Sequence, residues 1–165
     1  MTLQDHPALS VINDQNQPQQ QRNILVKELA HGAWLLVRGI RLWKRAFAQR
    51  SCIFAVTHDD FSSRNCMASV RYLDEIMCLF QVASHRPLVV NAVTAEDTTE
   101  DELRIVAMLR LIEGNRFEQA SLQLRDLVRG PLNLSIIRAC ADLALAFNKQ
   151  QLAFSQKPHI ALSNS

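Results

Sequence analysis

The chain has 165 residues, of which 48% are hydrophobic and 21% charged, with only 4 Gly and 5 Pro. This length fits one domain, and this composition is typical of a globular, largely helical protein rather than a disordered one. The formal net charge of +2 argues against a general nucleic-acid binder, and four scattered glycines cannot build a phosphate-binding glycine-rich loop.

Cysteine spacing and the terminal sequence bear on where the protein works. The four cysteines form no CxxC pair and no compact disulfide framework, so we expect reduced thiols. The N-terminus lacks the basic start and apolar run of a secretory signal, and no apolar stretch approaches the roughly 20 residues that cross a bilayer. We therefore expect a cytoplasmic protein without a transmembrane segment.

Both ends of the chain are predicted to be flexible. Residues 1–21 contain the run QNQPQQQ and few apolar side chains, which predicts a disordered Gln/Asn/Pro-rich tail. In the segment 152–165, Pro158 blocks a helix and small polar residues follow, which predicts a second flexible tail. The folded domain is then expected over 22–151.

The first predicted element is one long amphipathic helix over 22–50. One face carries polar and aromatic residues at spacings of three and four, which we name the cationic stripe: Lys27, His31, Trp34, Arg38, Arg41 and Arg45. Leucines and aromatic residues, including Trp43 and Phe47, occupy the opposite face. The segment holds seven Arg or Lys against one acid, whereas the rest of the chain holds eleven against fifteen.

The cationic stripe has three interpretations. It could bind a protein partner, it could follow a phosphate backbone or an anionic membrane surface, or its cations could pair with acids elsewhere in the fold, such as the run 96–102. No helix-turn-helix, RNP or zinc-finger signature accompanies the stripe.

Small residues repeat every seven positions along another flank of the same segment, at Gly32, Gly39 and Ala46. Because Gly costs about 1 kcal/mol relative to Ala inside a helix, this repeat indicates close packing against a second helix. That neighbour is either a helix of the same chain or a second copy, and the second option predicts a homodimer.

After this helix, the apolar, β-branched run 51–57 is expected to be extended. His58, Asp59, Asp60 and Ser62 are then expected to open a second helix, whose buried stripe runs from Met67 to Phe80 and which ends before Pro87. The short run 88–93 either pairs with 51–57 as a minor two-stranded β element or covers the core.

Three further helices complete the prediction. Thr99 and Glu102 have the spacing of a capping box, which predicts a helix from there to Gly114. An amphipathic stripe from Phe117 to Val128 predicts the next helix, and an apolar segment over 132–149 predicts the last. The expected fold is therefore an all-α, single-domain bundle of about five helices, the last three being neighbours.

Two segments resemble known families. Gly114, Phe117 and Ala120 match the turn, the aromatic and the small residue of a tetratricopeptide hairpin, so that 102–128 resembles one such unit, without its Trp and Tyr positions and without a tandem copy. This resemblance covers less than a fifth of the chain and implies only a helical hairpin.

The order of His31, His58, Asp59 and then Asp126 or Asp142 resembles that of HD-type metal phosphohydrolases. The resemblance implies a metal-dependent hydrolase on an all-α fold, but His58 and Asp59 are expected at the start of a helix and not inside one. Cys52, His58 and Cys66 are spaced by six and eight residues, unlike the paired ligands of zinc sites. We expect no metal ligands, no cofactor and no catalytic residues.

The combination of missing catalytic motifs and one cationic face favours a non-enzymatic helical binding or regulatory module that acts through protein–protein interaction. Nucleic-acid or anionic-surface binding through the stripe is the second hypothesis. An HD-like hydrolase is the third.

Overall fold

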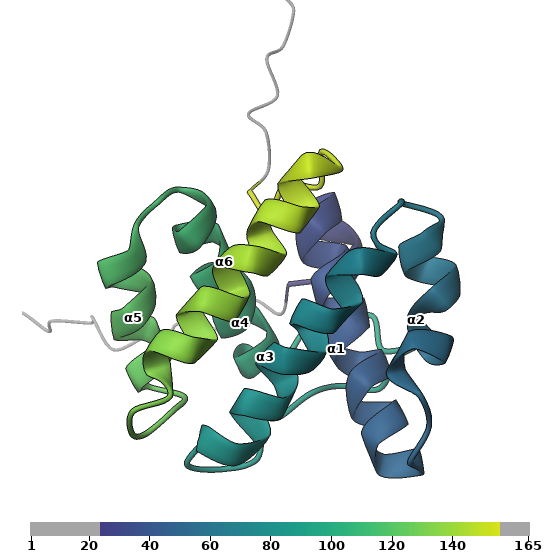
Figure 1. Cartoon of the computed structure of the whole chain (residues 1–165). Coiled ribbons are helices and arrows are strands. Elements are labelled where there is room, and N and C mark those ends of the chain that lie inside the picture. The colour runs from purple at the N-terminus through teal and green to yellow at the C-terminus, as the bar shows by residue number, and fades with distance from the viewer. Residues whose placement is uncertain (1–23, 156–165) are drawn as a thin grey trace, which may run out of the picture.

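The computed structural model describes residues 24–155, and within them the chain is all α-helical, as predicted (Figure 1). The predicted tail 1–21 and residues 156–165 lie outside this range. The described elements are two short 3-10 helices, η1 (Val26–Glu28) and η2 (Met67–Ser69), and six α-helices: α1 (His31–Gln49), α2 (Ile53–Ser62), α3 (Val70–Ala83), α4 (Glu100–Glu113), α5 (Phe117–Arg125) and α6 (Asn133–Lys149).

The prediction of one continuous helix over 22–50 is wrong at its N-terminal end, because α1 begins only at His31. Before it lie η1 and two residues of extended backbone, Leu29 and Ala30. The backbone of 24–26 bonds across to the segment 96–98 instead: the Val26 N–H donates to the carbonyl oxygen of Glu96 (2.8 Å). These hydrogen bonds join two distant segments of the chain. They use backbone N–H and C=O groups that a continuous helix would have paired internally.

The proposed two-stranded β element is also wrong. Residues 53–62 form α2, and 88–93 have no regular structure. Thr57 and Phe61, four residues apart, are the buried side chains of α2, so the segment 53–62 buries one face at helical spacing. His58 to Ser62, which were expected to open the next helix, lie inside α2, and α3 starts at Val70.

The three C-terminal helices follow the prediction closely. The capping box is present, since Thr99 Oγ1 accepts from the Glu102 N–H (3.1 Å) and Glu102 Oε2 accepts from the Thr99 N–H (2.9 Å). Helices α4, α5 and α6 pack against one another, α3 packs on α6, and α1 contacts α2, α3 and α4. Helix α5 ends at Arg125, although Leu127 and Val128 beyond it are still buried.

The folded domain extends beyond residue 151, where the flexible tail was expected to start. Leu152 and Phe154 are buried, and the Phe154 ring stacks on Phe147 of α6 with ring centroids 5.3 Å apart. Arg110 Nε donates to the Phe154 carbonyl oxygen (2.8 Å). Leu152 and Phe154 therefore belong to the core, and the chain is packed against the domain up to this point.

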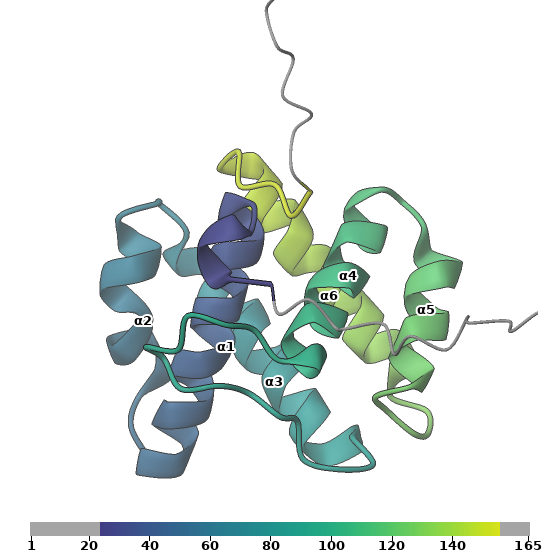
Figure 2. The same cartoon turned by 180° about the vertical axis from the view of Figure 1, so that it is seen from behind.

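Residues 84–99, which join α3 to α4, form a long connection without helix that we name the α3–α4 connection. Figure 2 shows it crossing α1 toward α2 and returning to the start of α4. No helix within residues 24–155 has the length and apolar character needed to span a membrane.

Candidate functional site

The centre of the cationic stripe holds the α3–α4 connection in place. Arg41 is only 3% exposed. Its guanidinium donates to both carboxylate oxygens of Glu102 (2.7 and 2.9 Å) and to the carbonyl oxygens of Ala95 (2.7 Å) and Asp97 (2.6 Å). A buried charge needs such complete pairing, because desolvation of an unpaired one is costly. Arg41 is therefore used within the fold.

Arg38 and Trp34 also have partners inside the chain. Arg38 Nε donates to Asp60 Oδ2 of α2 (2.8 Å), and its Nη1 reaches the carbonyl oxygen of Val93 in the connection (3.5 Å). The half-buried ring of Trp34 lies 4.7 Å from the guanidinium carbon of Arg64. These contacts join α1 to α2 and to the connection.

The other three members of the stripe are exposed. Within the described part of the chain, no hydrogen bond or ion pair is formed by the side chains of Lys27, His31 and Arg45. Lys27 precedes α1, His31 begins it, and Arg45 lies in its last two turns. At about 1.5 Å per residue, His31 and Arg45 are roughly 21 Å apart along the helix. The exposed residues of the stripe therefore do not form one continuous surface.

The small residues of α1 are packed against the same chain. A Cβ added to Gly39 would lie 2.7 Å from Leu73 Cδ2 of α3, and one added to Gly32 would lie 2.7 Å from the Ala153 carbonyl oxygen. Ala46 is buried as well. This flank of α1 has no room for a second copy.

The residues that resemble an HD-type metal set are not brought together. Within residues 24–155, no group of three His, Cys, Asp or Glu side chains could hold a metal ion. In the described part of the chain, the one polar contact of the His58 side chain is with its neighbour Asp59 (3.4 Å between Nδ1 and Oδ1), on the exposed side of α2. Among the cysteines, Cys66 and Cys140 are buried, and burial raises the pKa of both thiols.

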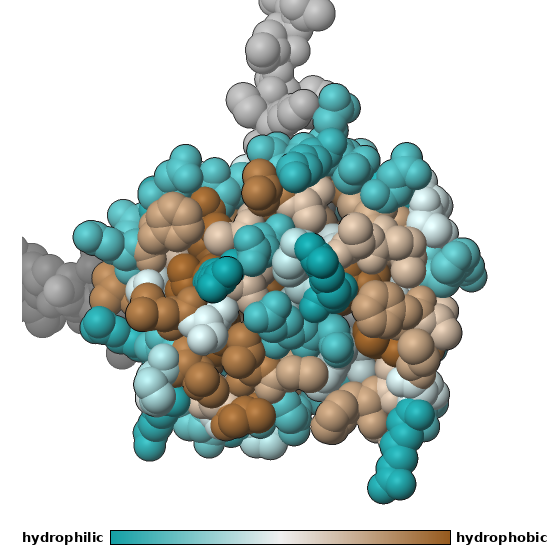
Figure 3. All heavy atoms as spheres, in the orientation of Figure 1, coloured by the Kyte–Doolittle hydropathy of each residue, from teal (hydrophilic) through white to brown (hydrophobic). Residues whose placement is uncertain are grey.

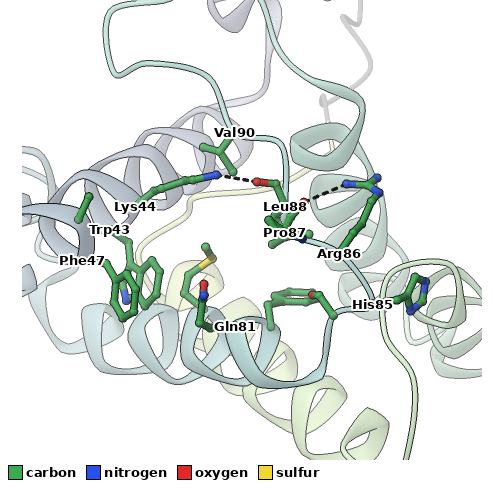
Figure 4. A pocket seen from close by; sticks show the side chains of 13 residues that line it. Trp43, Lys44, Phe47, Gln81, His85, Arg86, Pro87, Leu88 and Val90 are labelled. Carbon is green, nitrogen blue, oxygen red and sulfur yellow. Dashed lines mark hydrogen bonds between the residues drawn. The ribbon is translucent and has the colours of Figure 1, made fainter.

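One hollow of the described chain lies between α1, α3 and the start of the α3–α4 connection (Figure 4). It encloses about 350 Å³. Trp43 and Phe47 of α1 form one wall, with their rings stacked at a centroid distance of 4.9 Å. Phe47 is 57% exposed, whereas Trp43 is buried and its indole Nε1 donates to Asp74 Oδ1 (2.7 Å). Met77 and Phe80 of α3 line the hollow as well.

Polar groups surround this apolar wall. Lys44 spans the top of the hollow, and its Nζ donates to the Leu88 carbonyl oxygen (2.6 Å). The Oγ of Ser84, at the end of α3, is shielded from solvent and has no hydrogen-bond partner within residues 24–155. His85 points away from the hollow and contacts the Asp126 carbonyl oxygen (2.8 Å).

A second hollow of about 460 Å³ continues the first along α1. The two share Lys44, Ala48 and Val90, and the second adds Arg41, Arg45 and residues 91–94 of the connection. We name the two hollows together the aromatic groove. Among residues 24–155, no Asp or Glu lines either hollow, so the groove combines an apolar wall with a cationic rim.

The part of the connection that lines the first hollow is held by an ion pair between Arg86 and Asp101. Arg86 Nη1 and Nη2 donate to the two carboxylate oxygens of the buried Asp101 (2.6 and 2.8 Å), and the Val89 N–H donates to Asp101 Oδ2 (2.8 Å). Burial alone would raise the pKa of Asp101, but these hydrogen bonds outweigh it and the pKa is lowered. The same pairing raises the pKa of Arg86.

The helical pattern predicts Trp43 and Phe47 on a buried face and does not indicate the groove. Its walls come from α1, α3 and the connection, and no local pattern records how these meet. One sequence feature indicates an exposed aromatic residue here. Phe47 lies one turn beyond Trp43, near the end of the helix and among cations, where the apolar face extends beyond the core.

Comparisons of the chain with models of protein families, with curated proteins and with solved structures found no match.

Proposed function

We propose that this protein is a non-enzymatic binding module, and that its aromatic groove takes a segment of a protein partner that combines apolar and acidic side chains. The observation that carries this proposal is that the exposed Phe47 lies beside the rim cations Lys44 and Arg45, in a groove that no carboxylate of the described residues lines.

The apolar wall would supply the binding energy. Burying an aromatic side chain that is more than half exposed contributes on the order of 1–2 kcal/mol, and aromatic residues in desolvated pockets dominate most interfaces. Trp43 is stacked on Phe47 and tied to Asp74, so the wall is already ordered before a partner arrives. Preorganisation lowers the entropic cost of binding.

The rim would select the charge of the partner. Arg45 is exposed and without a partner in residues 24–155, so an acidic side chain can pair with it. Rim pairs of this kind contribute mainly to orientation and association rate. The groove is open along one side, which suits a peptide segment laid into it better than an engulfed small molecule.

The two other hypotheses have less support. In the nucleic-acid or anionic-surface hypothesis, Arg38 and Arg41 would face the ligand, but both already bind groups of the chain. For an HD-like hydrolase, residues 24–155 offer no convergent ligand set.

Selection from a random peptide display library tests the proposal. The wild-type protein should enrich peptides that combine apolar and acidic residues. The variants Phe47→Ser and Arg45→Glu should each lower affinity for the enriched peptides by about tenfold, equivalent to ~1.4 kcal/mol. The control Leu122→Ser changes an equally exposed apolar residue on α5, outside the groove, and should bind as the wild type does.

All three changed side chains are exposed, so circular dichroism should show an unchanged fold. Enrichment of basic peptides would contradict the proposal. So would affinity that depends on Leu122 and not on Phe47 or Arg45. Retention on heparin that is lost in Arg45→Glu, without any peptide enrichment, would favour the anionic-surface hypothesis instead.

A further inference from the structure

The outer face of α6 is an exposed apolar strip with one charge of each sign. Two large apolar side chains are exposed there, Leu134 at 80% and Leu145 at 55%. Between them on the same face lie Arg138, Ala141 and Asp142, because positions four, seven, eight and eleven residues after Leu134 fall on one side of a helix. Figure 3, viewed as in Figure 1, shows apolar residues gathered over α5 and the neighbouring part of α6.

The two charges of this strip have no partners within the described chain. Arg138 and Asp142 are four residues apart, but no ion pair forms between them, and neither bonds elsewhere in residues 24–155. In the pair Glu100 and Arg104 the acid comes first, and these side chains do bond (2.5 Å). The order with the base first is the less favourable one at this spacing, so both charges remain available to a partner.

The strip is complementary to itself. Arg138 and Asp142 lie two residues on either side of Cys140, while Leu134 and Leu145 lie six and five residues from it. In an antiparallel pair of helices that cross at this point, each Arg138 faces the Asp142 of the second copy, and each Leu134 faces the second copy's Leu145. We infer that the outer face of α6 is a homodimer surface, on which a second copy of this chain docks antiparallel about a two-fold axis.

The surface beside α6 fits the same arrangement. Phe117, Ala141 and Leu145 line a shallow hollow of about 230 Å³. In the antiparallel pair this hollow receives the projecting Leu134 of the second copy, and the small side chain of Ala141 lets the two helices approach closely near the axis. A partner with a single sign of charge would leave Arg138 or Asp142 unpaired, which is why a second copy is the occupant we choose.

The size of the strip sets the expected affinity. Helix α6 has 17 residues and is about 25 Å long. A strip of this length and about 10 Å wide is smaller than the roughly 800 Å² per partner of a standard interface. We therefore expect a weak dimer, with a dissociation constant of about 10–100 μM on the scale of small interfaces.

Sedimentation equilibrium of the full chain over about 5 to 500 μM tests this inference. The wild-type mass should rise with concentration from 18.7 kDa toward twice that value. In Arg138→Asp two acids would face each other across each contact, and in Asp142→Arg two bases would. Each variant alone should therefore stay monomeric over this range, a loss of association of about tenfold or more per like-charge contact.

Mixing the two variants gives the decisive measurement. In a mixed dimer, one chain supplies only acids and the other only bases at positions 138 and 142, so both contacts become attractive. The equimolar mixture should associate at least as well as the wild type, and the double variant Arg138→Asp with Asp142→Arg should dimerise again.

Arg45→Glu in the aromatic groove serves as the matched control and should leave the dimer unchanged. This control separates the dimer from the proposed peptide site. The inference is wrong if the wild type remains at 18.7 kDa up to the highest concentration, or if it dimerises and the single variants dimerise equally well. It is also wrong if the mixture of variants fails to associate while circular dichroism shows both to be folded.

Discussion

At the scale of single residues, Arg41 shows that a cation on the polar face of a predicted helix can be buried in the fold. Its position in the cationic stripe follows from helical spacing, but its surroundings depend on Glu102, 61 residues later in the sequence. Pairing with acids of the fold, such as the run 96–102, is one of the three interpretations of the stripe. The contact between Arg41 and Glu102 confirms this interpretation for Arg41. For Lys27, His31 and Arg45, binding to a partner remains a prediction.

We predict that Arg41→Met lowers the free energy of unfolding by about 3–5 kcal/mol, because it leaves the buried carboxylate of Glu102 without its cation. It also removes the donor for the carbonyl oxygens of Ala95 and Asp97. Urea unfolding followed by circular dichroism measures the change. Arg45→Met, one turn away and exposed, is the control and should change stability by less than about 0.5 kcal/mol. Equal effects of the two substitutions would show that the pair with Glu102 stabilises nothing.

At the scale of helices, the sequence predicted best where the signal is local. The start of α4 was correct because Thr99 and Glu102 satisfy each other's backbone within one turn. The first half of α2 was predicted to be extended because the apolar run 51–57 is too short for its spacing to distinguish a strand from a helix, and the helical spacing of Thr57 and Phe61 appears only when 58–62 are included. The start of α1 was placed too early because the bonds between 24–26 and 96–98 are not local.

The crossing of α1 with α2 and α3 depends on Gly39, which gives a prediction at the scale of helices. A Cβ there would lie 2.7 Å from Leu73 Cδ2 and 3.0 Å from Phe61 Cζ, both in the buried core. Overpacking costs about 1–3 kcal/mol, and the gain in helix propensity returns at most about 1 kcal/mol. Gly39→Ala should therefore lower the free energy of unfolding by about 1–2 kcal/mol in urea titrations.

Gly114→Ala is the matched control for this crossing. A Cβ at Gly114 would meet its nearest atom at 3.5 Å, an ordinary contact, and the backbone there has φ −85°, which any residue adopts. This substitution should be neutral or slightly stabilising. If Gly39→Ala is also neutral, the close approach of the helices at this point has no energetic role.

At the scale of the whole molecule, the two candidate surfaces lie on different sides. Helix α6 faces the viewer in Figure 1, whereas the α3–α4 connection, which forms part of the aromatic groove, faces the viewer in Figure 2. A dimer formed through α6 would therefore leave both grooves open. Neither surface could be found from sequence, because each depends on which side chains the packing leaves uncovered: Phe47 and Leu134 sit in helical patterns much like those of buried residues.

The α3–α4 connection makes the stability of the whole fold depend on pH. It is held at one end by Asp101, which accepts from Arg86 and from the Val89 N–H. The pKa of Asp101 in the folded protein is lowered from its usual value of 3.8. A lowered pKa means that the ionised form stabilises the fold above about pH 4, and that this contribution is lost as the pH falls through the folded-state pKa.

We predict that Asp101→Asn is less stable than the wild type at pH 5 to 7, and that the difference shrinks as the pH falls below 3.8, the pKa expected in the unfolded chain. Urea unfolding at pH 7, 5, 3 and 2.5 measures both free energies. Asp59→Asn is the control, since Asp59 is fully exposed and contacts only His58 in the described chain. Its stability should run parallel to that of the wild type. If the Asp101→Asn curve also runs parallel, then the ionised carboxylate is not what holds the connection, and its other hydrogen bonds, from Arg41 and with the backbone of 24–26, are sufficient.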